Sequence, residues 1–472
     1  MPRSIRYLLG LLAALALPIS SAMAAPAPLS QAQAQQVGTD AYVYGIDLLK
    51  FVHQTELDTS VTVPNQWGNA PINEVGNQRV LTTPANQDKE IVGPSNSTLY
   101  SNVHLDLTRG PIVLHVPAVP NHRYYAWEFL DPYLNVFHYV GTRTTGNGPG
   151  NYVVVGPHYK GHIPAGLHVV RAAYDHVWLF GRTLVYGKSD LAAAHRVQDG
   201  YKAIPLAAFE RVRLAYQPPK PHKIVTTPTD PGIPTGLAFF DKLGDALAEY
   251  PPPARDHAIL AEMASAGIGP GLHPSSEGLS PETLAGLTMA ADNGPAHVFA
   301  LRVQYATAGA AAHNGWFQTL PDTGNWGTDY AYRAVVAVYG ICANRPVEAT
   351  YGVGVKDNTG NVLNGSDSYR IHFAPGQIPP AKYFWSLTDY NIETWLAPNP
   401  YNKYSVGSNK GIKYNKDGSL DIYVQPTPPA GHESNWIPDP ANTQFILILR
   451  MYGPGASVIK GTYTYPQITR VS

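Results

Sequence analysis

The chain has 472 residues, of which 44% are hydrophobic and 14% charged, and its formal net charge is −1 at pH 7. This length suggests two or three domains of ordinary size, and the low charge together with 30 tyrosines argues against an intrinsically disordered protein. A near-neutral balance also argues against nucleic acid or an anionic membrane surface as a partner.

The first 24 residues are typical of a secretory signal peptide. Arg3 and Arg6 precede an apolar run at residues 8–17, and Ala22 and Ala24, which flank Met23, match the small-residue pattern of a cleavage site. The apolar run is shorter than the about 20 residues that a transmembrane helix needs, and no later run is long enough. We therefore expect a protein that is exported to the periplasm or the extracellular space, without membrane insertion.

A helix and then a β domain are predicted for the first part of the mature chain. Apolar residues recur at alternating intervals of four and three through residues 31–57, which predicts an amphipathic helix. Short β-rich runs broken by Gly, Pro and Asn follow through residues 58–190. This pattern predicts one β domain.

Helices separate this domain from a second β region. Residues 191–330 form the predicted connecting region, with a helical stretch opened by Asp190 and a Pro-rich segment at 217–236. Further helices are expected at 235–249, 256–265 and 280–309. Strands are expected to return over residues 331–472, where Gly and Asn mark hairpin turns. Cys342, the only cysteine, lies in an apolar setting and is expected to be a buried, inert thiol.

Long motifs in both β regions resemble two known families. The N-terminal region contains TLYSNVHLDLTRGPIVLHVP, RYYAWEFLDPYLNVFHYVGTRTTG, NYVVVGP and VWLFGRTLVYGKSDL, which resemble the DUF1254 family. The C-terminal region contains NVLNGSDSYRIHF, IPPAKYFWSLTDYN, DGSLDIYV, SNWIPDP and FILILRMYGP, which resemble the DUF1214 family.

The resemblance implies a mainly β protein with two antiparallel β-sandwich domains and flanking and linking helices. The N-terminal sandwich is expected to be immunoglobulin-like and the C-terminal one jelly-roll-like. No agreed biochemical activity comes with the resemblance. One position departs from the family pattern, because Ser97 stands where an aspartate is usual in an N-x-D-T-L-Y-S signature.

Two predicted strands each contain an arginine within an apolar run. Period-two alternation places Arg182 on the face of Trp178 and Phe180, and it places Arg450 on the face of Ile446 and Ile448. A buried guanidinium cannot lose its proton, so it requires a carboxylate or several carbonyl acceptors.

The candidate carboxylates lie at the ends of two aromatic strands. Asp131 follows YYAWEFL, and Asp389 ends YFWSLTD. We expect ion pairs of Arg182 with Asp131 and of Arg450 with Asp389, although the sequence also allows crossed partners. Such pairs either specify the fold or form a polar pocket that holds an anionic group of a ligand.

The strand at residues 383–390 has aromatic rings on both faces, so both faces are expected to be covered. Trp385 shares one face with Asp389, and Tyr390 lies on the other. Most of these rings are expected to belong to the core. Asp389 or Tyr390, at the strand end, is the better candidate for contact with solvent or a ligand.

A second set of candidate residues combines phenol, amide, imidazole and guanidinium groups: Tyr100, Asn102, His104, Asn135, His138 and Arg143. The turn GTRTTG can present Arg143 to an anion, and a histidine beside a tyrosine can act as a general acid or base. The alternative is that these histidines are packing residues with satisfied hydrogen bonds.

The sequence leaves two functions open. The first is the binding of a small or carbohydrate-like ligand in an aromatic-lined polar cleft between the sandwiches. The second is a cofactor-independent hydrolase or lyase, in which Asp131, Asp389, Tyr100 or His138 acts as acid or base and Arg143 or Arg182 stabilises negative charge.

The sequence contains no G-x-S-x-G, H-E-x-x-H or P-loop motif, so no metal or cofactor is predicted. An enclosed pocket that gathers Tyr100, Asn135 and Arg143 favours the enzyme, whereas a shallow ring-lined groove favours the binding protein. Edge strands of such sandwiches are also compatible with a homo-oligomer.

Overall fold

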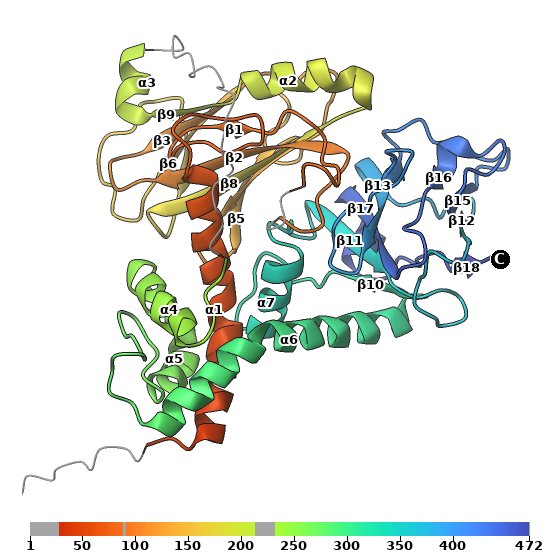
Figure 1. Ribbon diagram of the computed structural model, residues 1–472. Helices are drawn as coiled ribbons and strands as arrows, with labels where there is room; N and C mark the ends of the chain where they lie inside the picture. Colours follow the sequence, from red (N-terminus) through yellow and green to blue (C-terminus); the bar gives the residue numbers. More distant parts are fainter. Residues whose placement is uncertain (1–27, 88–90, 213–231, 472) are drawn as a thin grey trace, which may run out of the picture.

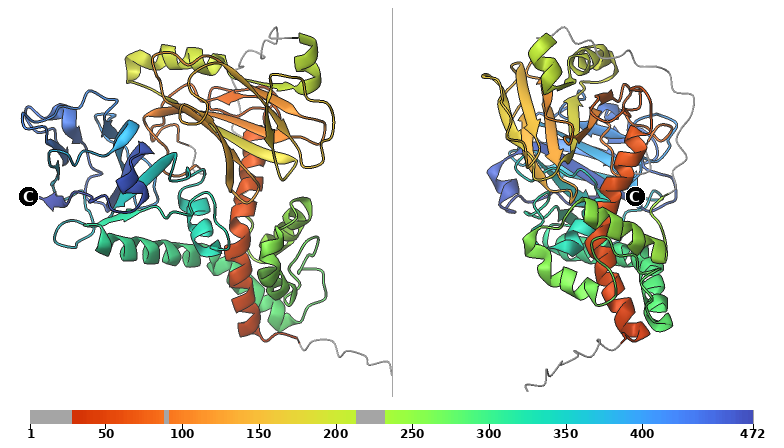
Figure 2. Two further views of the ribbon diagram at one scale, coloured as in Figure 1. Left: turned by 180° about the vertical axis from the view of Figure 1, so that it is seen from behind. Right: turned by 90° about the vertical axis from the view of Figure 1, so that its left-hand side faces the viewer.

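The computed structural model describes residues 28–87, 91–212 and 232–471. The predicted signal peptide and most of the Pro-rich segment therefore lie outside the described residues. Within them, the chain forms two β-sandwiches that stand on a layer of helices (Figures 1 and 2).

The N-terminal sandwich packs a five-stranded sheet against a four-stranded sheet. The strand orders are β1-β2-β8-β4-β5 and β7-β6-β3-β9, and β6 with β7 is the one parallel pairing among them. The strand bounds are β1 Gly76–Asn77, β2 Thr98–Asp106, β3 Ile112–Val116, β4 Tyr125–Leu130, β5 Val136–Gly141, β6 Gly150–Val155, β7 His168–Arg171, β8 His176–Leu184 and β9 Lys202–Pro205. Alternate residues such as Trp127, Leu179 and Val154 fill the core between the two sheets.

The C-terminal sandwich repeats this construction with a different connectivity. Its five-stranded sheet has the order β10-β11-β17-β13-β14, and its four-stranded sheet has the order β16-β15-β12-β18. The strand bounds are β10 Trp316–Gln318, β11 Ala349–Gly354, β12 Tyr369–Phe373, β13 Ala381–Asn391, β14 Ser405–Gly407, β15 Leu420–Val424, β16 Trp436–Ile437, β17 Phe445–Pro454 and β18 Ile468–Arg470. The core between the sheets includes Trp385, Leu387 and Leu449.

The two five-stranded sheets are also buried on their outer faces, where the sandwiches meet. Tyr124 and Leu184 of the N-terminal sandwich pack with Ala349, Phe384 and Tyr452 of the C-terminal one. This confirms the expectation that both faces of the strand at 383–390 are covered, and it places the outer faces of the two sheets against each other.

Helices lie on two sides of the sandwiches (Figure 1). The helix bounds are α1 Gln31–Thr59, α2 Leu191–Asp199, α3 Leu206–Val212, α4 Leu237–Glu249, α5 His257–Ala264, α6 Pro281–Ala312, α7 Tyr330–Tyr339 and α8 Ala456–Ile459. The helices α1, α4, α5, α6 and α7 lie together on one side of the sandwiches, whereas α2 and α3 lie on the opposite side of the N-terminal sandwich (Figure 1). The helix α1 packs along α6, and Gly286 permits their close approach because a Cβ there would lie 2.3 Å from the carbonyl oxygen of Gln31. The helix α6 continues to β10 beneath the C-terminal sandwich (Figure 2). None of the described helices is long and apolar enough to cross a membrane.

Two segments differ from the predicted elements. The segment from residue 331, expected to begin the strands, forms α7, because Asp329 caps the helix by accepting from the backbone N–H of Tyr332 and the helix packs on α1. Residues 202–204, the end of the predicted helical stretch LAAAHRVQDGYKAI, lie in β9, because α2 ends at Asp199 with Gly200 as its C-cap and the next residues pair with β3. In both cases tertiary packing decided the conformation.

Candidate functional site

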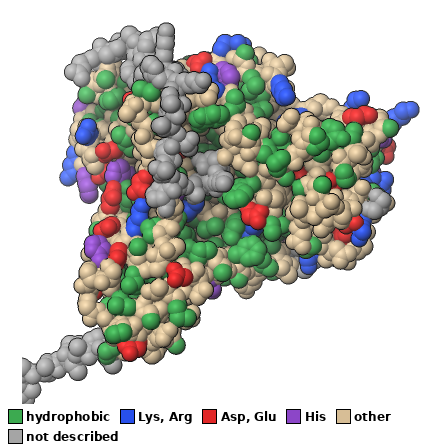
Figure 3. Space-filling view, viewed as in Figure 1, with side chains coloured by type: hydrophobic (Ala, Val, Ile, Leu, Met, Phe, Trp, Pro, Cys, Tyr) green, Lys and Arg blue, Asp and Glu red, His purple; other side chains and the backbone are tan. Residues whose placement is uncertain are grey.

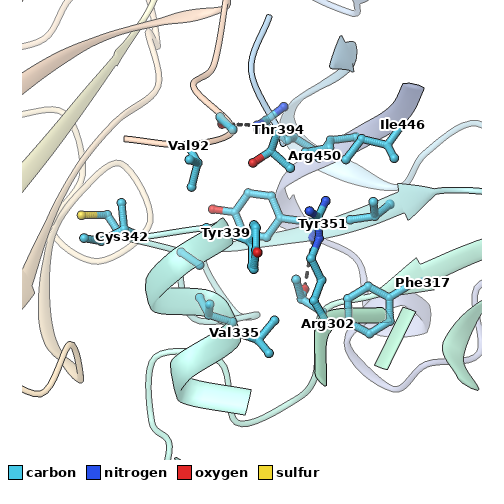
Figure 4. A pocket seen from close by; sticks show the side chains of 18 of the residues that line it. Val92, Arg302, Phe317, Val335, Tyr339, Cys342, Tyr351, Thr394, Ile446 and Arg450 are labelled. Carbon is cyan, nitrogen blue, oxygen red and sulfur yellow. Dashed lines mark hydrogen bonds between the residues drawn. The ribbon is translucent and has the colours of Figure 1, made fainter. Parts of the chain in front are cut away.

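A cavity of about 150 Å³ lies between the two sandwiches and the helices α6 and α7 (Figure 4). Its wall includes Tyr100 and Phe180 from the N-terminal sandwich, Tyr351 and Ile448 from the C-terminal one, and Tyr339 from α7. On the face shown in Figure 3, hydrophobic side chains gather around the junction of these parts. The cavity is thus bounded by both domains and is lined mainly by aromatic and aliphatic groups.

Strand alternation directs the lining side chains into this space. Arg182 of β8 lies opposite Tyr100 of β2, and Arg450 of β17 lies opposite Tyr351 of β11. All four residues line the cavity. The sequence predicted the strand faces of both arginines correctly, because Phe180 lies beside Arg182 in the cavity wall.

Arg182 forms a buried ion pair, but not with the expected carboxylate. Its Nη1 lies 2.9 Å from Oε1 of Glu128. Its Nη2 donates to the carbonyl oxygen of Cys342 at 2.5 Å. Burial raises the pKa of Glu128 to about 7, and the Arg182 guanidinium opposes that rise. The predicted pair with Asp131 is wrong because Glu128, and not Asp131, lies on the face of β4 that Arg182 shares.

Arg450 has no carboxylate partner among the described residues. Its side chain is 3% exposed. Its Nη2 donates to the carbonyl oxygen of Gly93 at 2.5 Å, whereas Nη1 is buried without a hydrogen-bond partner in the described part of the chain. The guanidinium carbon lies 5.3 Å from the ring centre of Tyr390. The predicted pair with Asp389 is wrong, because Arg450 lies opposite Ser386 and Asp389 projects from the other face of β13.

A third arginine of the cavity wall was missed by the sequence analysis. Arg302 of α6 donates from Nη1 to the carbonyl oxygen of Ile392 at 2.7 Å, and its guanidinium carbon lies 4.4 Å from the ring centre of Tyr339. Burial lowers the pKa of Arg302, while Tyr339 and Glu393 act in the opposite direction. A usable signal existed, since Arg302 is the only Asp, Glu, Lys or Arg between Asp292 and Asp322.

Asp131 and Asn135 lie outside the cavity wall and bind each other. The carboxylate of Asp131 accepts from the backbone N–H groups of Tyr133 and Asn135 and from the Asn135 side chain. Burial raises the pKa of Asp131 to about 6. These hydrogen bonds close the turn between β4 and β5.

Asp389, Trp385 and Tyr390 belong to the interior. Trp385 lies in the core of the C-terminal sandwich, and the hydroxyl of Tyr390 donates to the carbonyl oxygen of Pro94 at 2.5 Å. Burial and then the nearby charge of Asp439 raise the pKa of Asp389 well above its usual value. Asp389 or Tyr390 was expected to contact solvent or a ligand; their exposed fractions are 5% and 0%, so neither faces solvent, and neither lines the cavity.

The second candidate set is not assembled into one site. Tyr100 lines the cavity, and its hydroxyl accepts from the backbone N–H of Ser95 at 2.6 Å. Asn102 accepts from Nε1 of Trp178, and His104 lies 2.9 Å from Asp58. The remaining two residues also have other neighbours: burial lowers the pKa of His138, which packs edge-on against Phe129, and Arg143 pairs with Glu348.

Left-handed backbone conformations shape part of the cavity wall. Cys342 and Thr394 have φ of 60° and 67°, and Gly93 has φ of 61°. Such values are uncommon for residues with a side chain and are costly for a β-branched one. The thiol of Cys342 is buried, as expected, and burial raises its pKa well above the usual value. No group of three or more His, Cys, Asp or Glu residues suited to a metal occurs in the described ranges.

Comparisons with known proteins give a family and a fold. Residues 72–205 match a family described as protein of unknown function DUF1254, and residues 348–456 match one described as protein of unknown function DUF1214. The crystal structure of the VPA0106 protein from Vibrio parahaemolyticus has 24% identity and a TM-score of 0.65, and the match covers 93% of this chain and 100% of that one. A putative uncharacterized protein from Burkholderia cenocepacia has 11% identity and a TM-score of 0.46, with 93% and 94% covered. No curated protein matches the chain.

Proposed function

The chain belongs to the family of proteins that join a DUF1254 domain to a DUF1214 domain, and on that premise we propose that it binds a small molecule in the cavity between its two sandwiches. This proposal rests on the cavity of about 150 Å³, whose wall contains residues of both domains. Because residues 1–24 are typical of a signal peptide, we also propose that this binding protein is exported.

The size of the cavity favours a ligand over a packing defect. The cavity is partly open to its surroundings, so a small molecule can enter it. A junction that served only to hold two domains together would gain from closing it. Cavities of this size with apolar walls take up molecules of about the size of benzene.

The lining favours an apolar ligand body over a sugar. Two hydroxyl groups of the wall already have partners, since Tyr100 accepts from the backbone N–H of Ser95 and Tyr351 accepts from the backbone N–H and the side-chain amide of Asn344. A sugar would bring several hydroxyl groups that each need a hydrogen bond when buried. Rings such as Tyr339 and Phe317 instead offer stacking surfaces.

Binding is favoured over the alternative of a hydrolase or lyase by the positions of the candidate acids and bases. Of Asp131, Asp389, Tyr100 and His138, Tyr100 alone lines the cavity. General acid–base chemistry requires the group to lie within hydrogen-bond reach of the reacting atoms. Asn135 and Arg143, which the enzyme hypothesis placed in the pocket, are also absent from the described cavity wall.

A variant that fills the cavity tests the proposal. The mature protein is screened by thermal shift and calorimetry against benzoate, benzamide, benzylammonium, hexanoate and glucose. Ala306→Phe places a ring in the cavity wall, whereas Ala300→Phe adds the same ring to an exposed position of the same helix.

We expect at least one probe to bind the wild type and Ala300→Phe, and to lose binding in Ala306→Phe. A probe that binds all three proteins equally would show a site elsewhere. If no probe raises the melting temperature of the wild type, the proposed function is rejected.

A further inference from the structure

In the described part of the chain, four arginines have an exposed fraction below 9%, and three of these four have a carboxylate partner. Arg123 pairs with Asp190 at 2.5 Å, Arg182 with Glu128 at 2.9 Å, and Arg333 with Asp47 at 3.0 Å. Arg450, at 3% exposed, is the exception among the described residues. Because a guanidinium keeps its charge at any physiological pH, each of the four needs an anion or a full set of acceptors.

The hydrogen bonds of Arg450 leave part of that requirement unmet. Nη2 donates to the carbonyl oxygen of Gly93, but Nη1 has no partner in the described ranges and is shielded from solvent by its neighbours. The rings of Tyr351 and Tyr390 lie near the guanidinium, with centre distances of 5.9 Å and 5.3 Å. Rings offset part of the cost of a buried cation, but each contributes only about 1–2 kcal/mol.

The cavity has a positive balance beyond Arg450. Its described wall contains Arg182, Arg302 and Arg450 and no acidic residue. Glu128 neutralises Arg182, while no carboxylate of a described residue lies within 4 Å of a nitrogen of Arg302 or Arg450. Figure 4 shows Arg302 and Tyr339 from the helices, and Tyr351 and Arg450 from the C-terminal sandwich, around the same space.

We propose that the ligand is a small organic monoanion, with an apolar body and one carboxylate, and that Arg450 binds the carboxylate. This inference rests on the proposed function and names the ligand class of that cavity. The planar guanidinium matches the geometry of a carboxylate, and the pair is strengthened where water is excluded. The aliphatic and aromatic wall, including Ile446 and Phe317, accommodates the apolar body.

Other anions fit this space less well. A phosphate group at neutral pH carries up to two charges and three acceptor oxygens, which call for several donors. Among the described residues of the largely apolar cavity wall, Nη1 of Arg182 is ion-paired with Glu128, and Nη1 of Arg450 is the buried arginine nitrogen with neither a hydrogen bond nor an ion pair. A carboxylate requires fewer donors and brings less polar surface into the cavity.

Three probes of nearly equal shape test the inference in the wild type: benzoate, benzamide and benzylammonium. We expect calorimetry to show benzoate binding at least about tenfold more tightly than benzamide, because a charged acceptor strengthens the bond to the guanidinium. Benzylammonium is expected not to bind. The benzoate affinity is also expected to fall in Ala306→Phe.

Variants at position 450 test whether Arg450 causes the preference for benzoate over benzamide. Arg450→Met is expected to bind benzoate and benzamide with affinities within a factor of about three of each other, and Arg450→Lys to retain the preference for benzoate. Arg171→Met, which removes an exposed arginine, is the matched control and should bind as the wild type does. Should Arg450→Met fail to fold by circular dichroism, Arg450→Gln takes its place, with the same expected loss of the benzoate preference, because it also removes the charge.

The outcomes separate this inference from the proposed function. If benzamide binds the wild type as tightly as benzoate and Ala306→Phe abolishes both, the cavity binds ligands but the inferred class is wrong. If Arg450→Met keeps the benzoate preference, the carboxylate is bound elsewhere and the inference is overturned. If no probe binds the wild type, both proposals fail.

Discussion

The Nη1 atom of Arg182 lies 2.9 Å from Oε1 of Glu128, and the two side chains are 6% and 0% exposed. Their strands are neighbours in one sheet, and Arg182 lies opposite Ala126, two residues from Glu128. The pair stands beside the cavity but carries no net charge. We therefore expect substitutions in the Arg182–Glu128 pair to change the stability of the protein, and substitutions of Arg450 to change ligand binding.

Breaking the pair by removing one partner should destabilise the protein strongly. Glu128→Gln leaves the guanidinium of Arg182 buried beside a neutral amide, and we expect a loss of about 3–5 kcal/mol in the free energy of unfolding. The double variant Glu128→Leu with Arg182→Met removes both charges and should be more stable than Glu128→Gln. Urea denaturation of the three proteins measures this, and equal losses in the single and double variants would contradict it.

Arg450 should behave differently in the unliganded protein. Arg450→Met removes a buried charge that has no carboxylate partner among the described residues, so we expect the free energy of unfolding to change by no more than about 1 kcal/mol. Arg333→Met is the matched comparison, because it leaves Asp47 buried and unpaired. A loss in Arg450→Met as large as that in Arg333→Met would indicate a structural partner.

The buried carboxyl of Asp439 should make the protein more stable in mild acid. Burial raises the pKa of Asp439 from 3.8 to about 7, and neither of its carboxylate oxygens has a hydrogen-bond partner in the described chain. The folded state thus binds the proton more tightly than the unfolded state, so the stabilisation is complete below the unfolded pKa and is lost as pH rises through about 7. Between the unfolded pKa and about pH 7, we expect this proton to change the free energy of unfolding by on the order of 2–4 kcal/mol, and we expect Asp439→Asn to lack that change.

Denaturation of wild type and Asp439→Asn at a series of pH values from about 4 to 8 measures this difference. Asp199→Asn is the control, because Asp199 lies at the surface with a side chain 61% exposed. Parallel pH profiles for wild type and Asp439→Asn would show that Asp439 does not bind the proton in the folded state.

Lys410 should give a pH dependence of the opposite sign at higher pH. Burial and then the nearby charge of Lys403 lower the pKa of Lys410 from 10.5 to about 7. Its Nζ lies 2.6 Å from Oγ of Ser405 and 2.7 Å from the carbonyl oxygen of Asn96. Because the folded state releases this proton more readily, its stabilising contribution is present above the unfolded pKa and is lost as pH falls through about 7.

We therefore expect the wild type to gain stability relative to Lys410→Met as pH rises from about 7 to 10. Lys242→Met, at a surface ion pair with Glu56, is the control and should follow the wild-type profile. A constant difference between wild type and Lys410→Met across this range would be inconsistent with a lowered pKa.

The sequence predicted strand faces better than it predicted partners. Alternation along VWLFGRTLVY and FILILRMY correctly placed Arg182 on the face of Phe180 and Arg450 on the face of Ile446 and Ile448, and these faces line the cavity. It could not tell which strand lies alongside at which register. Glu128 and Asp131 point to opposite faces of the sheet, because side chains alternate along a strand. Without knowing which face Arg182 shares, the sequence could not distinguish the two carboxylates, and the pair forms with Glu128.

The cavity itself was beyond sequence reasoning. Its wall combines residues as distant in the chain as Tyr100, Arg302 and Arg450, and an arginine without a carboxylate looks the same in sequence as one with a partner. A cavity lies between the sandwiches, but neither Trp385 nor Tyr390 lines it: Trp385 belongs to the core of the C-terminal sandwich, and Tyr390 packs against Ile446 and Ile448.

The sequence alone determined the family, the two sheet-rich regions with helices between them, and the burial of two arginines, because composition and periodicity are local properties of the chain. Only the tertiary structure decided that Arg182 meets Glu128 while Arg450 faces a cavity. Pairing depends on strand order, register and the packing of two domains, and these are set by the free energy of the whole fold, not by any segment of it.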